Sequence, residues 1–147
     1  MKATEGSIGR IFLLRLDDGD VIPDCIEKFA AAKNIRHAQV TLVGGIAGGE
    51  VVAGPRQSRE MPPDPMRLPV DGAHEVTGTG IIAPDQDGQP VLHIHAALGR
   101  AGRTLTGCLR PGVTAWLVTE AVVIEILGLN ARRLPDAASG FTLLQVE

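Results

Sequence analysis

The sequence contains few of the residues on which several common classes of protein depend. Only two of its 147 residues are cysteines, Cys25 and Cys108, which is too few for a disulfide-stabilised scaffold. Aromatic residues make up 3% and tyrosine is missing, so few rings are present to stack on nucleic-acid bases. The net charge is -3 and no long run of lysine or arginine occurs. These features argue against sequence-independent binding to nucleic acids, which needs a positively charged surface.

Long hydrophobic runs are also missing. The longest apolar stretch, residues 113–127, contains Thr114, Thr119, Glu120 and Glu125, so it does not suit a membrane span. No charged segment followed by an apolar segment opens the chain, as it would in a secretory leader. We therefore expect a soluble, cytoplasmic protein. A hydrophobic share of 44% is enough for a buried core, and the length predicts one domain over residues 1–147.

Alternating apolar residues and frequent turn residues predict a mainly β protein. One helix is expected after Asp20, which could cap it, and should end near Lys33 and Asn34. With about seven or eight strands, the pattern favours an antiparallel α+β fold, a barrel-like sheet with one main helix packed outside. The predicted strands cover residues 10–16, 37–43, 50–53, 75–82, 91–98, 104–109, 112–127 and 141–146, the last of which should close the sheet.

A proline-rich segment interrupts this pattern at residues 54–70. It contains Pro55, Pro62, Pro63 and Pro65 together with several charges, so neither a helix nor a central strand can run through it. We expect a long loop, and the sequence leaves open whether it covers a functional site.

The most informative motif is the pair His93 and His95 in the predicted strand 91–98. Residues two apart in a strand point to the same face, so both imidazoles share one surface. If the following turn is centred between Ala101 and Gly102, the hairpin places His95 directly opposite Cys108. Facing residues in such a pair have Cβ atoms about 5 Å apart. The sequence therefore predicts that two imidazoles and one thiol converge.

This set of side chains is typical of a metal site. Three protein ligands with an open fourth position suit a catalytic type of zinc centre, and zinc is the first choice. Iron, nickel and copper also accept imidazole and thiolate. The alternative is that the two histidines are merely solvated or bonded to the backbone, with Cys108 a small buried residue. Cys25, on the apolar side of the predicted helix, is expected to be such a residue.

Three charged residues are further candidates for the site. Glu120 interrupts an apolar stripe in the last long strand and could transfer a proton, or could form a structural ion pair or lie on an exposed face. Arg103 and Arg110 could hold an anionic group of a substrate.

The order of these features resembles the plant and prokaryote conserved (PPC) domain, also called domain of unknown function 296 (DUF296), over residues 10–146. The most specific match is Leu92-His93-Ile94-His95 followed by the turn that contains Gly107. The other matching elements are Asp18-Gly19-Asp20, Val40 to Gly49, Glu75, Gly80, Gly107-Cys108-Leu109 and Glu120.

The resemblance implies an antiparallel sheet with a flanking helix, assembled as a homotrimer. Many members of the family have Gly-Gly-His where this chain has Thr106-Gly107-Cys108, and their three histidines resemble a zinc site. Carried over to this chain, His93 and His95 take the first two ligand positions and Cys108 the third. The fold of the family is similar to that of acetolactate decarboxylase, which also binds zinc through histidines.

The same family is labelled DNA-binding because its plant members carry an AT-hook, a short Arg-Gly-Arg-Pro segment that this sequence does not contain. The leading hypothesis is therefore a homotrimeric, metal-binding protein that binds a small oxygen-bearing metabolite, and an enzymatic role is left open. The alternatives are a DNA-associated regulatory or interaction module without catalysis, a zinc-dependent lyase resembling acetolactate decarboxylase, and a metal-sensing or storage role.

Overall fold

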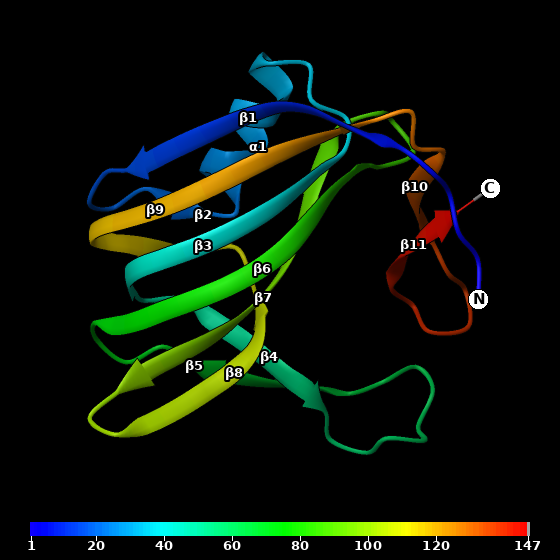
Figure 1. Cartoon of the computed structure of the whole chain (residues 1–147). Helices are drawn as coiled ribbons and strands as arrows, with labels where there is room; N and C mark the ends of the chain where they lie inside the picture. The colour runs from blue at the N-terminus through cyan, green and yellow to red at the C-terminus, as the bar shows by residue number, and fades with distance from the viewer. Residues whose placement is uncertain (147) are drawn as a thin grey trace.

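The computed structural model describes residues 1–146 and contains eleven strands and one α-helix (Figure 1). Within these residues no helix is long and apolar enough to cross a membrane. The elements are β1 Ser7–Leu16, β2 Val21–Ile22, α1 Asp24–Ala32, β3 Ala38–Ala47, β4 Glu50–Pro55, β5 Pro65–Pro69, β6 His74–Pro84, β7 Pro90–Arg100, β8 Arg103–Leu109, β9 Val113–Leu127, β10 Ala131–Pro135 and β11 Thr142–Val146.

Nine of the strands form one antiparallel sheet. Its order is β1-β9-β3-β6-β7-β8-β4-β5, with the short β2 added to β9. The sheet is strongly twisted and curved, with α1 behind it (Figure 1). The predicted antiparallel α+β fold with one main helix is confirmed. The sheet has more strands than expected, however, and it is not closed into a barrel, because β1 and β5 end it without pairing to each other.

The hydrophobic core lies between α1 and the concave face of the sheet. The helix buries Ile26 and Ala30, while Val40 of β3 and Ile94 of β7 point inward against them as part of one buried cluster. Because side chains alternate along a strand, the residues on either side of Ile94 must point outward. The core therefore determines that His93 and His95 lie on the outer face of the sheet, where both are exposed.

The helix begins later than the sequence suggested. It starts at Asp24 after Pro23, because Val21 and Ile22 first pair with β9 as β2. The Asp20 carboxylate caps a turn instead of the helix, since its Oδ2 accepts a hydrogen bond from the backbone N–H of Asp17 at 3.0 Å. The prediction that Asp20 caps the helix is therefore wrong.

The prediction for the C-terminal strand is also wrong in its pairing. β11 forms where expected, but it pairs with β10 in a separate two-stranded sheet and does not close the main sheet. The two strands are joined by a turn in which the Asp136 carboxylate accepts hydrogen bonds from the backbone N–H and the hydroxyl of Ser139, at 2.9 and 2.6 Å. This local turn allows a hairpin to form without help from the main sheet.

The proline-rich segment is a loop for most of its length but ends in β5. This strand pairs only with β4 and so lies at the edge of the sheet. A proline cannot donate a hydrogen bond to a second neighbour, which is why Pro65 and Pro69 are tolerated there.

Candidate metal centre

The hairpin formed by β7 and β8 sets the geometry of the site. Its two turn residues, Ala101 and Gly102, have φ angles of 49° and 74°. Two successive positive φ angles are characteristic of the type I′ turn, whose twist matches that of the strands it joins. Arg100 consequently pairs with Arg103, and His95 faces Cys108. The register expected from the sequence is confirmed.

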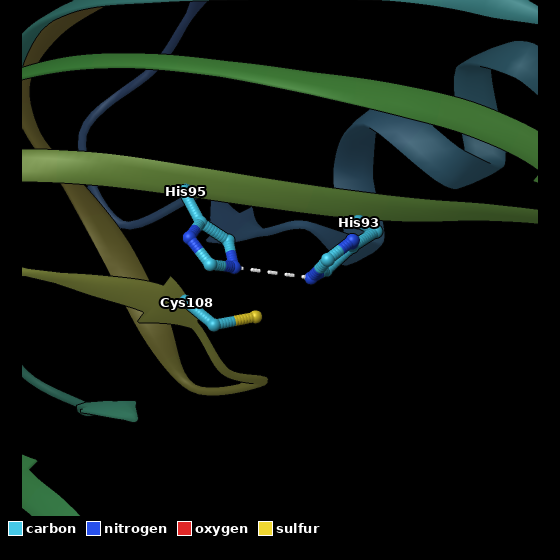
Figure 2. Close-up of side chains that lie close together, drawn as sticks. All are labelled: His93, His95 and Cys108. Atoms are coloured by element: carbon cyan, nitrogen blue, oxygen red, sulfur yellow. Dashed lines mark hydrogen bonds between the residues drawn. The ribbon is translucent and has the colours of Figure 1, made fainter. Parts of the chain in front are cut away.

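The histidines and the cysteine converge on one space above the outer face. The Nε2 atoms of His93 and His95 lie 3.2 Å apart. The nitrogen and sulfur ligand atoms of His93, His95 and Cys108 all lie within 4.8 Å of one another. Figure 2 shows the two rings turned toward each other, with the sulfur beside them. In a tetrahedral zinc site with Zn–N bonds of about 2.05 Å, two ligand nitrogens are about 3.3 Å apart, so the spacing of the imidazoles fits a metal ion.

The surroundings of the cluster influence the protonation of its members. Partial burial lowers the pKa of His93, and the charges of Arg133, His95 and Arg110 lower it further. Burial raises the pKa of the Cys108 thiol, although Arg110 and Arg133 oppose this effect. A neutral imidazole is ready to ligate a metal, whereas a protonated thiol must first release its proton. Metal binding at this cluster would therefore be coupled to proton release from Cys108.

The cluster lies where β7 and β8 separate. Their pairing ends at His95 and Cys108, so the earlier residues of β7 have no partner in β8. The free backbone N–H of Leu92 donates instead to the Glu27 carboxylate of α1 at 2.7 Å. This bond ties the helix to β7 next to His93. Partial burial raises the pKa of Glu27, while the bond from Leu92 lowers it.

Arg133 of β10 binds backbone carbonyls of β6 and β7 near the site. Its Nε donates to the Val91 carbonyl at 3.3 Å and its Nη2 donates to the Ile81 carbonyl at 2.9 Å. The side chain is buried, and burial lowers the pKa of its guanidinium. Sequence analysis identified neither Glu27 nor Arg133, because no local pattern connects them to the histidines.

Arg110 follows β8 directly and lies next to the cluster. Arg110 lies two residues beyond Cys108, after the last pair of the hairpin, and its charge acts on both His93 and Cys108. Its backbone N–H donates to the Glu50 carbonyl at 3.2 Å. Its Nε is buried and has no hydrogen-bond partner in the described part of the chain. Arg110 is therefore the predicted substrate-binding residue whose position agrees with the site.

The other two candidates lie elsewhere. Arg103 is at the turn end of β8, five residues from Cys108, which corresponds to about 17 Å along a strand. Glu120 is exposed on β9, which is separated from β7 by β3 and β6, a distance of about 14 Å across the sheet. The structure does not bring either residue to the histidines.

A shallow hollow of about 410 Å³ borders the two histidines on the outer face. It is lined by Gln39, Thr79, Gly80, Ile81, His93 and His95. The lining combines amide and hydroxyl groups with one aliphatic side chain, and none of these residues carries a carboxylate. The hollow suits a small ligand with polar and apolar parts.

Comparison with known proteins identifies the family. The model of the Plants and Prokaryotes Conserved (PCC) domain matches residues 3–127. The chain belongs to this family. The resemblance of the sequence to the PPC domain is thereby confirmed, since both names denote the same domain.

Solved structures share the fold of this PCC-domain chain over nearly its whole length. A metal-containing protein from Archaeoglobus fulgidus is 26% identical, with a TM-score of 0.85 and 99% of each chain covered. A plant- and prokaryote-conserved protein from Pyrococcus horikoshii is 23% identical, with a TM-score of 0.85. The match covers 100% of this chain and 99% of that chain. A candidate DNA-binding protein from Ralstonia eutropha JMP134 is 20% identical, with a TM-score of 0.72. The match covers 92% of this chain and 90% of that chain.

A curated relative is much longer than this chain. The bifunctional protein GlmU of Synechococcus sp. (strain JA-3-3Ab) is 26% identical over 140 residues, which are 94% of this chain and 21% of the relative. The PCC-domain chain thus spans about a fifth of the length of that protein.

Gly80 allows β6 and β7 of this PCC domain to approach closely beside the site. A Cβ atom at Gly80 would lie 2.5 Å from the His93 carbonyl oxygen and 2.7 Å from the Ile94 Cβ. Such contacts cannot be accommodated without moving β7, which carries the histidines. Gly99, on the same strand β7, has no atom within 4 Å of an added Cβ.

We expect the Gly80→Ala variant to lose about 1–3 kcal/mol of unfolding free energy, because overpacking forces the two strands apart. The matched Gly99→Ala variant should change by less than about 1 kcal/mol, and in the stabilising direction. Urea denaturation followed by circular dichroism measures both. Equal stability of the two variants would show that β6 and β7 can separate without cost.

Proposed function

We propose that this PCC-domain protein binds a transition metal ion through His93, His95 and Cys108, and binds a small metabolite in the adjoining hollow. The observation that carries the proposal is the convergence of three ligand atoms within 4.8 Å on one outer face. The similarity to a metal-containing protein from Archaeoglobus fulgidus supports it. When bound, such an ion supplies a Lewis acid that polarises an oxygen of the metabolite.

Zinc is the first choice of metal. Zinc accepts a mixed set of neutral imidazoles and a thiolate, and with three protein ligands it retains an open position for a ligand. The lowered pKa of His93 favours the neutral imidazole that this bonding needs. Iron, nickel and copper bind the same ligand types and remain the alternatives.

A role in binding a metabolite is better supported than lyase activity. Proton transfer needs an acid or base within hydrogen-bond reach of the substrate. The hollow has no carboxylate in its lining, and Glu120 lies about 14 Å away across the sheet. A zinc-dependent lyase resembling acetolactate decarboxylase is therefore the less favoured form of this proposal.

Elemental analysis of tag-free protein should find about one zinc per chain, as expected for a single three-ligand site. The double variant His93→Ala, His95→Ala should contain almost none, because a lone thiol is a weak site. The matched control is His74→Ala, which removes a histidine of β6 outside the cluster and should leave the metal content unchanged. Stoichiometric metal in the folded double variant would reject the assignment.

We also propose that the chain forms one domain and assembles as a homotrimer through its apolar outer face. This face is a group of exposed hydrophobic side chains, namely Ile11, Leu13, Val43 and Val118. Leu13 is 75% exposed and Ile11 65% exposed in the single chain. Exposed apolar patches of this kind mark sites of association. A second copy of the chain is the proposed occupant, as the family resemblance implies.

The proposed trimer would also bring a neighbouring copy toward the metal site. Leu13 lies in register with Val122, Thr41, Thr79 and His95 across four neighbouring strand pairings. The apolar outer face and the histidines are thus parts of one continuous surface.

The Leu13→Glu variant should dissociate the trimer, because a carboxylate would have to be buried at the interface. Multi-angle light scattering should give the mass of three chains for the wild type and of one chain for the variant. Leu144→Glu places the same change on β11, in the separate two-stranded sheet, and should retain the trimer. A wild-type mass of one chain would contradict the proposal.

A DNA-associated regulatory role is the second candidate, supported by the similarity to the Ralstonia protein. The net charge of -3 argues against direct contact with phosphates and favours an indirect association. A filter-binding titration across salt concentrations should therefore detect only weak binding to duplex DNA. Tight binding that falls steeply with salt would instead make the second candidate the better one.

A further inference from the structure

Arg110 has a hydrogen-bond donor that no group in the described part of the chain accepts. Its Nε is buried and has no partner in residues 1–146. A buried donor without a partner is costly, by roughly 1–3 kcal/mol and more when the group is charged. Arg110 follows β8 two residues after Cys108, at the edge of the candidate metal-ligand cluster, and its charge acts on His93. A ligand that accepts a hydrogen bond from Arg110 would remove this cost.

The charges around the cluster favour an anion as that ligand. The ionic side chains that act on His93 and Cys108 are Arg110, Arg133 and, for His93, also His95, and none of them is a carboxylate. Arg133 already donates to two backbone carbonyls and is offset in charge by Glu27, which leaves Arg110 as the uncompensated cation. A divalent metal ion on two neutral imidazoles and one thiolate would add one further positive charge. An excess of positive charge in a partly dehydrated site attracts an anion.

The lining of the hollow beside the histidines indicates which class of anion would bind there. Its lining includes the amide of Gln39 and the hydroxyl of Thr79, which can bond to oxygen atoms. It also includes Ile81, which offers an apolar surface. A wholly polar ion such as phosphate makes no use of that surface, whereas an organic acid has both a charged group and an apolar part. Guanidinium groups also match the planar geometry of a carboxylate.

We propose that Arg110, on the β8 side of the histidines, binds the carboxylate of a small organic acid that reaches past them, so that its apolar part lies in the hollow lined by Ile81 on the β6 side. This inference rests on the proposed metal-binding function, because the metal ion contributes to the positive charge that attracts the acid. It names the class of the metabolite and assigns its recognition to Arg110.

The test uses the Nε–Hε signal of Arg110, which NMR spectroscopy detects directly in uniformly ¹⁵N-labelled, zinc-loaded protein. Butyrate is the probe, because it combines one carboxylate with a short apolar chain and has no other metal-binding group. Butyrate should shift the Arg110 signal in a saturable manner. Butyramide, which has the same shape without the charge, should not.

Substitutions of Arg110 then test whether butyrate contacts this residue. Arg110→Gln should raise the Kd of butyrate by about tenfold or more, because one charge-assisted hydrogen bond is lost. Arg110→Lys retains the charge without the planar group and should have an intermediate effect. Arg103→Gln is the matched control at the other end of β8 and should leave the Kd unchanged. Unchanged affinity in both folded Arg110 variants would overturn the assignment, as would equal binding of butyramide.

Two further outcomes separate this inference from the proposed metal function. If the wild type holds about one zinc per chain and butyrate fails to bind, the metal function stands and the carboxylate inference is wrong. If inorganic phosphate shifts the Arg110 signal more strongly than butyrate, the site binds anions of another class and the inference is again wrong. If butyrate binds through Arg110 in protein that takes up no metal, recognition by Arg110 stands and the metal function fails.

Discussion

The register of the β7–β8 hairpin is the constraint on which the candidate site depends. Ala101 and Gly102 both adopt positive φ angles, and this turn fixes which residues of the two strands face each other. A slip of one residue would move every side chain of β8 to the opposite face of the sheet. Cys108 would then point into the core, away from the histidines. The ligand set thus follows from a two-residue turn at the far end of the hairpin.

The second requirement is that the two strands separate immediately beyond the ligands. Separation leaves backbone groups of β7 unpaired, and a buried backbone group without a partner is costly. Glu27 of α1 supplies a partner for one of them, the Leu92 N–H. This bond satisfies one of the backbone groups that the separation leaves beside His93.

Local patterns in the sequence predict eight of the eleven strands, the hairpin register and the outward direction of His93 and His95, but they miss the short strands β2, β5 and β10. They could not predict Glu27 and Arg133, which lie 65 and 42 residues from the backbone groups they bind. Alternation placed Glu120 correctly on one face of β9, but it could not show that this face is exposed in the single chain. The partner of β11 was misjudged for a similar reason, since a strand pattern does not specify which strand it joins.

The burial of Cys108 has a consequence for the durability of the protein. Thiols react with peroxides and disulfides through the thiolate form, and burial suppresses that form here. The side chain is also only 7% exposed, which limits the approach of an oxidant. The Cys108 sulfur is therefore poorly accessible to oxidants, and any cation that binds it would first have to displace its proton.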